Sequence, residues 1–252
     1  MKIALITGAS SGLGSAYVRY VKDIFPEIDQ IWALARRKHR LDKLASEVRT
    51  VRIKGIECDL TDANDLEALR QRLREEKPEI MLLVNNAGCG FHGAFDSSVE
   101  AEQQRCVDLN VSALTRITRI ALDYMPEGAR VLNTCSISSF VPNANMAVYC
   151  ASKAYVSFFS RALNGELKPT NRSSTIVCPA PMNTEFLTVG HIRGNSKTFE
   201  KLPYCNVDQV AKGALLAAKK RRAVYTPRAF YKFYRFLVRL LPDALLIKLA
   251  KT

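Results

Sequence analysis

Tyr149 and Lys153 are the residues whose types and spacing most clearly point to chemistry. In a helix, residues four positions apart lie on one face. A free phenol has a pKa of roughly 10 and is a weak base at neutral pH, but a neighbouring ammonium group favours the phenolate. We therefore expect Tyr149 to exchange a proton with a bound substrate. Such a Tyr/Lys pair is also common on the surfaces of helices, so the surrounding sequence must show whether this pair is catalytic.

A glycine-rich segment, TGASSGLG from Thr7 to Gly14, follows the apolar run Lys2–Thr7. Glycines between a strand and a helix let the backbone approach a pyrophosphate, and the helix N-terminus adds free N–H groups and positive potential. The alternative is a tight turn whose glycines serve only packing. The position of the glycine-rich segment, directly after the first predicted strand, favours nucleotide binding.

Apolar runs alternate with helical patterns through the first 180 residues or so. The predicted strands are Lys2–Thr7, Gln30–Ala35, Val51–Cys58, Ile80–Asn85, Arg130–Thr134 and Ser174–Cys178, with a last strand at Ala223–Thr226. The clearest predicted helices are Leu41–Val48, Asp62–Glu76, Glu100–Met125 and Tyr149–Leu167. This alternation predicts one doubly wound Rossmann-type α/β domain, with a mostly parallel sheet of about seven strands and helices on both faces.

The chain of 252 residues shows no linker, repeat or low-complexity stretch. We expect residues 1–226 to form the nucleotide-binding and catalytic domain and residues 227–252 a basic amphipathic helical tail. Residues 183–205 are polar and lack sustained periodicity, which is typical of a functional loop. We interpret them as a substrate-covering flap, with a passive loop as the alternative.

Five motifs stand in an order that resembles the short-chain dehydrogenase/reductase family over roughly residues 2–185. They are the TGxxxGxG turn, Asn85-Asn86-Ala87-Gly88, Asn110 within a long helix, Ser136 after the fifth strand, and Tyr149-Cys150-Ala151-Ser152-Lys153. The resemblance implies hydride transfer between a nicotinamide cofactor and a carbonyl or secondary alcohol. Tyr149 would then be the acid/base, aided by the positive charge of the oxidised cofactor.

The resemblance also implies roles for the other catalytic candidates. Ser136, thirteen positions before Tyr149 as in the family, would donate to the substrate oxygen. Ser138 and Ser139 compete with it but have the wrong spacing. Asn110 would anchor a water that connects Lys153 to solvent, or would only bend its helix, and Lys153 would also bind the nicotinamide ribose.

The end of the second strand bears on the choice of cofactor. In dinucleotide folds an acid there binds the ribose 2′-hydroxyl, whereas an arginine accommodates a 2′-phosphate. Ala35 occupies the usual place of the acid and Arg36 follows it. NADP(H) is therefore favoured over NAD(H). The alternative is that these basic residues only form the start of a solvent-exposed helix.

Further cofactor contacts are implied by the resemblance. Asp59 would contact the adenine amino group or would cap a turn, and Asn86 would lie beneath the adenosine ribose or would brace the sheet. Ala180 replaces the family's usual glycine after proline, which a negative φ would accommodate. The expected cofactor-binding residues are Gly8, Ser10, Ser11, Gly12, Leu13, Gly14, Arg36, Asp59, Asn86, Ala87, Gly88, Tyr149, Lys153 and Thr184.

Composition excludes several other classes of protein. The seven scattered cysteines form no CxxC pair and the three histidines are far apart, so we expect no metal site and a reducing, cytoplasmic setting. The longest charge-free run, residues 131–152, contains too many polar residues for a membrane span. No signal peptide is expected at the N-terminus.

The net charge of +13 is concentrated in the tail, because Lys219–Thr252 holds ten basic residues and one acidic residue. The basic residues Arg228, Lys232, Arg235 and Arg239 share one helical face, and Phe230, Phe233, Tyr234, Leu237, Leu240 and Leu241 lie opposite. Such a helix could lie on a membrane surface, or its apolar face could pack on the enzyme or on a sister subunit. No nucleic-acid motif accompanies the charge.

Taken together, the residues and the resemblance predict an NADP(H)-dependent oxidoreductase acting on a lipophilic carbonyl or alcohol of steroid, retinoid or 3-oxoacyl type. Two alternatives are an NADPH-binding sensor or scaffold without turnover, and a peripheral membrane-interaction module. We expect a homodimer or homotetramer formed through the helices at Glu100–Met125 and Tyr149–Leu167. We expect no nucleic-acid partner, and cytoplasmic location with possible peripheral membrane contact.

Overall fold

The computed structural model describes residues 1–196, 200 and 202–249. Its centre is a seven-stranded sheet in the order β3-β2-β1-β4-β5-β6-β7, and every pair of neighbours is parallel. The strands are β1 Lys2–Thr7, β2 Gln30–Ala35, β3 Arg52–Glu57, β4 Glu79–Asn85, β5 Arg130–Thr134, β6 Ser173–Val177 and β7 Val224–Tyr225. The predicted Rossmann-like α/β fold is confirmed.

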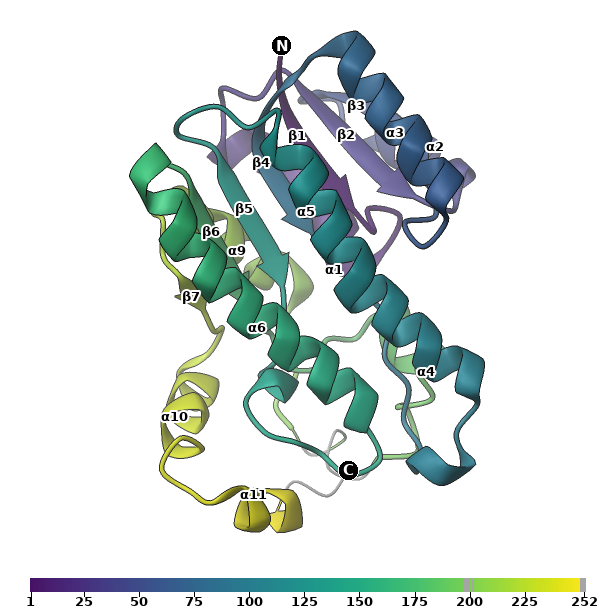
Figure 1. The fold of residues 1–252 in the computed structure, drawn as a ribbon, viewed down its shortest axis with the longest axis vertical. Helices are drawn as coiled ribbons and strands as arrows, with labels where there is room; N and C mark the ends of the chain where they lie inside the picture. The colour runs from purple at the N-terminus through teal and green to yellow at the C-terminus, as the bar shows by residue number, and fades with distance from the viewer. Residues whose placement is uncertain (197–199, 201, 250–252) are drawn as a thin grey trace.

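The helices connect these strands and cover both faces of the sheet (Figure 1). They are α1 Gly12–Ile24, α2 Lys38–Glu47, α3 Ala63–Glu76, α4 Glu100–Val107, α5 Leu114–Leu122, α6 Ala147–Leu167, α7 Glu185–Val189, α9 Val207–Lys219, α10 Ala229–Leu237 and α11 Asp243–Leu249. Short 3₁₀ turns occupy Phe95–Ser97, Ile137–Ser139 and Lys168–Thr170.

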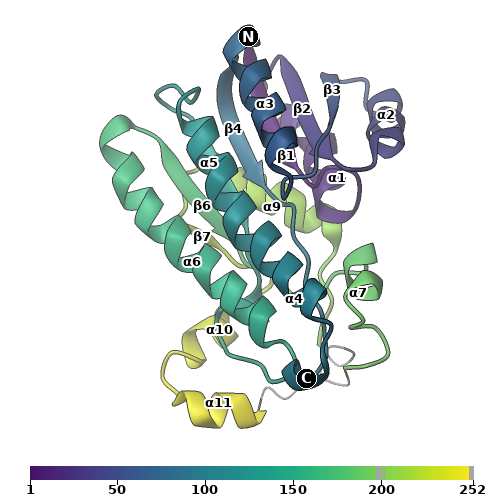
Figure 2. The same ribbon diagram turned by 45° about the vertical axis from the view of Figure 1, so that its right-hand side comes forward.

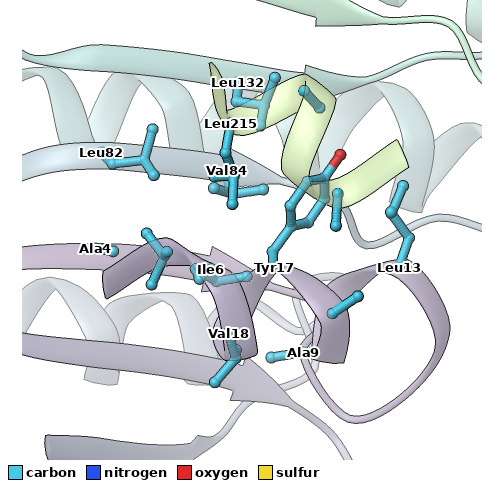
Figure 3. Close-up of a cluster of buried hydrophobic side chains, with 14 of the residues drawn as sticks. Ala4, Ile6, Ala9, Leu13, Tyr17, Val18, Leu82, Val84, Leu132 and Leu215 are labelled. Atoms are coloured by element: carbon cyan, nitrogen blue, oxygen red, sulfur yellow. The ribbon is translucent and has the colours of Figure 1, made fainter. Parts of the chain in front are cut away.

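Alternate residues of each strand point into two separate cores. In β1, Ala4 and Ile6 pack with α1 and α9, whereas Ile3 and Leu5 pack on the opposite face with α3, α5 and α6. Figure 3 shows the first of these cores, where Tyr17 of α1 lies among strand side chains and Leu215 of α9. Burial on both faces explains why the strands read as continuous apolar runs.

The long helix predicted over Glu100–Met125 is interrupted by a π-helical segment, Asp108–Ala113, and α5 ends at Leu122. A π turn is a frequent sign of a functional site within a helix. The inserted residue rotates the helix locally and brings Asn110 into the interior, where it is 1% exposed.

The order of the sheet reverses between β1 and β4, since β2 and β3 lie on one side of β1 and β5 to β7 on the other. In open α/β sheets, ligands bind beyond the carboxyl ends of the strands at such a switch point. Figures 1 and 2 show α10 and α11 at the same end of the molecule as the lower end of α6, and Figure 2 shows α7 there as well. Residues 197–199 and 201, in the predicted flap, and residues 250–252, in the predicted tail, lie outside the described residues.

Candidate active site

Tyr149 and Lys153 lie one turn apart on α6 and both are buried. The Lys153 ammonium lies 5.8 Å from the centre of the Tyr149 ring and donates to the carbonyl oxygen of Thr134, 3.0 Å away, at the end of β5. Ser136, just beyond β5, lines the same cleft as Tyr149, and its side chain acts to lower the pKa of the phenol. The three predicted catalytic side chains therefore come together at the carboxyl edge of the sheet.

The hydroxyl of Ser136 is oriented by the backbone. Ser136 caps the short 3₁₀ turn at Ile137–Ser139, and its Oγ accepts a hydrogen bond from the Ser138 N–H at 3.1 Å. With one lone pair occupied in this way, the hydroxyl can donate its proton toward Tyr149 or toward a substrate oxygen. Ser139 instead donates to the Ser136 carbonyl oxygen. Of the two competing serines, only Ser138 lines the cleft.

Burial is the largest influence on the ionisation of both groups. It raises the pKa of Tyr149 above its ordinary value, and the Ser136 side chain partly opposes this effect. Burial also lowers the pKa of Lys153. Burial thus opposes ionisation of the phenol, and the prediction that Lys153 and the oxidised cofactor together make Tyr149 acidic stays a prediction.

Asn110 joins three segments around the site. Its amide nitrogen donates to the Cys89 carbonyl oxygen at 2.7 Å and to Ser152 Oγ at 2.9 Å, and its amide oxygen accepts from the Cys89 N–H at 3.0 Å. The π segment thus ties α6 to the loop after β4. This contact pattern describes a brace and matches the helix-bending alternative, while the water relay stays a prediction.

The glycine turn has a backbone conformation that favours glycine. Gly8 and Gly12 adopt left-handed φ values of 63° and 53°, which other residues rarely take. A Cβ on Gly8 would lie 2.8 Å from the Ala87 Cα, so this glycine lets the turn approach the end of β4. Gly14 does not line the cleft; it lets α1 pack against the Gly8 carbonyl group.

The segment after β4 is tied to the glycine turn. Thr7 Oγ1 accepts from the backbone N–H groups of Asn86 and Ala87 at 2.9 and 3.1 Å. The Asn86 amide donates to the Thr7 and Gly8 carbonyl groups. Asn86 therefore braces the sheet and also lines the cleft. The role of Thr7 was missed because a threonine at a strand end has no distinctive sequence signal.

The end of β2 holds more than the predicted Arg36. Arg36 is exposed and lies 3.8 Å from the carboxylate of Asp59, which accepts hydrogen bonds from the backbone N–H and the hydroxyl of Thr61. Asp59 thus caps a turn, although the N-cap of α3 is Asp62. Both Arg36 and Asp59 line the cleft.

Arg37 reaches further over the glycine turn than the sequence suggested. Its guanidinium donates to the hydroxyls of Ser10 and Ser11 at 3.2 and 3.0 Å and pairs with Glu185 at the start of α7. Arg40 pairs with the same carboxylate at 2.5 Å. The adjacent arginines 36 and 37 look equivalent in sequence, and only the course of the chain after β2 distinguishes them.

The loop after β6 completes the cleft. Ala180 has no positive φ, so the alanine is accommodated as expected at the position where the family usually has glycine. Thr184 lines the cleft, and its side chain would lie 3.3 Å from a Cβ on Gly12. The loop therefore faces the glycine turn across the expected cofactor site.

Two glycines allow close packing around the Tyr149 ring. A Cβ on Gly90 would lie 2.8 Å from Tyr149 Cε2. The backbone of Gly190, after α7, lies against the backbone of Gly90. The Gly190 carbonyl oxygen accepts a hydrogen bond from the His92 N–H at 2.9 Å. Neither glycine was identified from the sequence, because neither belongs to a motif that the sequence analysis used.

One cleft of about 270 Å³ connects these features. All of the predicted site residues except Gly14 and Asn110 line it. The wall of the cleft beyond Tyr149 is apolar. This apolar wall was not predicted from the sequence. The apolar lining residues near Tyr149 are Met146, Met182, Phe186, Leu187 and Ile192. Phe186 contacts Tyr149 directly, with the ring centres 5.7 Å apart.

The described part of the chain contains no group of three or more residues placed to hold a metal ion. Among its helices, none combines the length and the apolar character needed to cross a bilayer.

The arrangement is that of a nucleotide-binding fold with a phenol, a hydroxyl and an ammonium group at its switch point. The family model for the short chain dehydrogenases matches residues 2–190. The chain therefore belongs to the short-chain dehydrogenase/reductase family, as the resemblance indicated.

Characterised relatives include reductases of different substrates. The chain is 33% identical over 195 residues to sulfoacetaldehyde reductase 2 of Chromohalobacter salexigens, which covers 74% of this chain and 75% of that protein. It is 30% identical over 174 residues to the very-long-chain 3-oxoacyl-CoA reductase of Anas platyrhynchos, covering 66% and 54% of the two chains.

Solved structures show the same fold over nearly the whole chain. A short-chain dehydrogenase from Sphingobium yanoikuyae in complex with NADPH superimposes with a TM-score of 0.78 at 30% identity, covering 97% of this chain and 98% of that one. A bulky-bulky ketone specific alcohol dehydrogenase from Comamonas testosteroni gives 0.76 at 31% identity, covering 95% and 92%.

Proposed function

We propose that the protein is an NADP(H)-dependent oxidoreductase that interconverts an apolar ketone or aldehyde and its alcohol. The observation that carries this proposal is that Ser136, Tyr149 and Lys153 line one cleft together with the glycine turn, with the Lys153 ammonium 5.8 Å from the centre of the Tyr149 ring. Family membership supports the reaction class, and the cofactor preference and the substrate class rest on the arguments below.

The chain's own residues can perform the proton chemistry. Because its pKa is raised, Tyr149 is protonated at neutral pH and can give its proton to a carbonyl oxygen held at its Oη. Ser136 can donate a second hydrogen bond to the same oxygen and stabilise the developing negative charge. The buried Lys153 ammonium keeps positive charge near the phenol as it loses its proton. When bound, the nicotinamide supplies or accepts the hydride.

The cleft fits a dinucleotide. Gly88 leaves room beside Asn110 and Lys153, since a Cβ there would lie 2.9 Å from the Asn110 Oδ1 and 3.4 Å from the Lys153 Nζ. At the other end, the absence of an acid at Ala35 and the cations Arg36 and Arg37 favour a 2′-phosphate, which guanidinium groups bind with paired hydrogen bonds. NADP(H) is therefore the proposed cofactor.

The apolar wall supports a lipophilic substrate. Phe186, Leu187 and Ile192 belong to residues 183–205 and contact the apolar cluster that includes Tyr149 and Met146. We therefore assign this segment as the flap that covers the substrate and excludes water. The names of two relatives, a bulky-ketone alcohol dehydrogenase and a long-chain 3-oxoacyl reductase, agree with a large apolar carbonyl compound of the steroid, retinoid or 3-oxoacyl type.

Association and location follow from surface features. Phe158 of α6 is 74% exposed and Tyr155 lies on the same helix, so α5 and α6 are the proposed subunit interface of a homodimer or homotetramer. All seven cysteines are free thiols, which agrees with a reducing compartment such as the cytoplasm.

The test is cofactor consumption by the purified protein with a panel of carbonyl compounds graded in apolar size. We expect turnover with NADPH, at a higher kcat/KM than with NADH, and increasing kcat/KM as the apolar substituents grow. Tight NADPH binding without turnover on any substrate would contradict the proposal and favour a sensor or scaffold.

A further inference from the structure

The helix α10 uses one face to pack on the protein. Tyr231 of α10 and Val238, the C-cap residue of that helix, are buried, and the Tyr231 hydroxyl donates to the Pro203 carbonyl oxygen at 2.8 Å. Val238 packs in a small apolar cluster with Val141 and with Leu246 of α11. The tail therefore packs on the enzyme through Tyr231 and Val238, and Tyr234 and Leu241 of the predicted apolar face are partly buried in the same contact.

The opposite face of α10 is apolar and exposed. Phe233 and Phe236 have exposed fractions of 64% and 62%, and Leu240, just after α10, is 67% exposed. Phe230 and Leu237 extend this surface on one side, and α11 adds Leu245 and Ile247, which are also exposed. We call these seven residues the tail apolar surface. Soluble proteins rarely leave several large apolar side chains exposed on one short helix unless they bind something.

Cations border the tail apolar surface. Lys232 is exposed on the other flank of α10, Arg239 is exposed in the turn that follows α10, and Lys248 is exposed on α11. None of the tail cations forms an ion pair with a carboxylate in the described part of the chain. The segment from Lys219 to Thr252 carries ten basic residues and one acidic residue. An occupant of this surface must therefore be apolar and negatively charged.

A surface of anionic phospholipid has both properties. Helices with a cationic flank and large apolar side chains lie in the plane of the interface, with the apolar face inserted among the acyl chains and the cations at the headgroups. A second copy of this chain would instead bring two strongly basic segments together, which repel each other. Nucleic acid would satisfy the cations but would leave the phenylalanines in water.

We propose that α10 and α11 dock the protein on anionic membrane surfaces. Phe233, Phe236 and Leu240 enter the interface, and Lys232 and Arg239 bind lipid phosphates. This association is peripheral and reversible, since the two helices are short and are held to the body by Tyr231 and Val238.

The docking surface is connected to the candidate active site. Val141, which Val238 contacts, stands five positions after Ser136 in the chain. Arg228 donates to the Tyr204 carbonyl oxygen at 2.8 Å, and Tyr231 to that of Pro203, both at the end of residues 183–205. Docking would therefore place the loops around the cleft near the lipid. The docking itself does not depend on the proposed activity.

The test is co-sedimentation of the full chain with sucrose-loaded vesicles of phosphatidylcholine alone and of phosphatidylcholine with phosphatidylglycerol. We expect binding to the anionic vesicles that weakens with added salt, and little binding to the neutral ones. The Lys232→Gln/Arg239→Gln variant should bind roughly 25-fold more weakly, at about fivefold for each cation lost. The Phe233→Ser/Phe236→Ser/Leu240→Ser variant should lose its binding to the anionic vesicles.

Matched controls alter equally exposed residues elsewhere. Phe95→Ser removes a phenylalanine that is 67% exposed, and Arg49→Gln/Arg72→Gln removes two exposed cations. Both controls should bind like the natural chain, and circular dichroism and NADPH binding should show that all variants are folded. Equal binding of the natural chain and the serine variant would overturn the proposal. So would a serine variant that changes only the oligomeric state, because the surface would then be a subunit interface.

Discussion

The guanidinium group of Arg37 lies 2.9 Å from the carboxylate of Glu185, which follows 148 residues later in the chain. Arg40 donates to the other oxygen of the same carboxylate, and these two hydrogen bonds lower the pKa of Glu185. The first residue of α7 is thereby connected to the arginines that stand over the glycine turn. Glu185 and a cofactor 2′-phosphate would compete for the same guanidinium group of Arg37.

Replacement of Glu185 by glutamine should therefore strengthen the binding of NADPH relative to NADH. The variant removes the competing negative charge but keeps the shape of the side chain. We expect the Kd for NADPH to fall severalfold and the Kd for NADH to change little, measured by the fluorescence of the reduced nicotinamide. A parallel change in both constants would show that Glu185 does not compete with the 2′-phosphate.

Gly90 should be required for the position of the catalytic phenol. Its alanine variant would place a Cβ 2.8 Å from Tyr149 Cε2, so the buried ring or the loop must move. Displacement of a reacting group by about 1 Å can cost on the order of 10²-fold in rate. We expect Gly90→Ala to reduce kcat by that order while the Kd for NADPH stays nearly unchanged.

Gly165 provides the control for this variant. It is exposed on α6, the helix that carries Tyr149, and a Cβ there would meet no atom within 4 Å. Gly165→Ala should leave kcat unchanged and stabilise the fold by about 0.5–1 kcal/mol, because alanine favours the helix. If both variants lost activity equally, the contact of Gly90 with Tyr149 would not be the cause.

Asn110 should matter for stability as well as for activity. Asn110→Ala removes the partner of the Cys89 N–H and one of the two donors to the Cys89 carbonyl oxygen, and a buried polar group left unsatisfied costs roughly 1–3 kcal/mol. We expect a loss of that size in the free energy of unfolding, measured by urea denaturation, with a reduced kcat. An unchanged midpoint of urea denaturation would mean that water replaces the Asn110 amide without loss of stability.

The ionisation of Tyr149 should depend on the cofactor. Since burial raises its pKa, the phenol should stay protonated in the free protein up to at least its ordinary pKa of roughly 10. The positive charge of oxidised nicotinamide should lower that value, because it stabilises the phenolate. The measurement is the ultraviolet absorbance of tyrosinate, taken as the difference between the natural chain and Tyr149→Phe. Ionisation of Tyr149 near neutral pH without cofactor would contradict this account.

Much of the fold and many of the cleft-lining residues follow from sequence because local signals specify them. Strands buried on both faces read as apolar runs, and the glycine turn, Ser136 and the Tyr149 helix stand directly at strand or helix ends. In a parallel sheet the carboxyl ends of neighbouring strands meet at one edge, so these motifs converge there.

Contacts between distant segments could not be predicted in this way. The pairing of Arg37 with Glu185 and the packing of Gly90 on Tyr149 depend on the three-dimensional course of loops that carry no periodic pattern. The packed side of the tail was only partly evident, because Tyr231 and Val238 lie between the two faces expected from periodicity, whereas Tyr234 and Leu241 belong to the apolar one. The pKa of Tyr149 depends on burial, which spacing from Lys153 does not reveal.

The most direct test of the account is the rate of NADPH consumption by Tyr149→Phe on the best carbonyl substrate of the natural chain. The variant removes only the hydroxyl, so we predict that NADPH binding persists while the rate falls by about 10²–10⁴-fold, the contribution typical of a general acid. A variant that binds NADPH and reduces the carbonyl compound at the natural rate would contradict the assignment of Tyr149 as the proton donor.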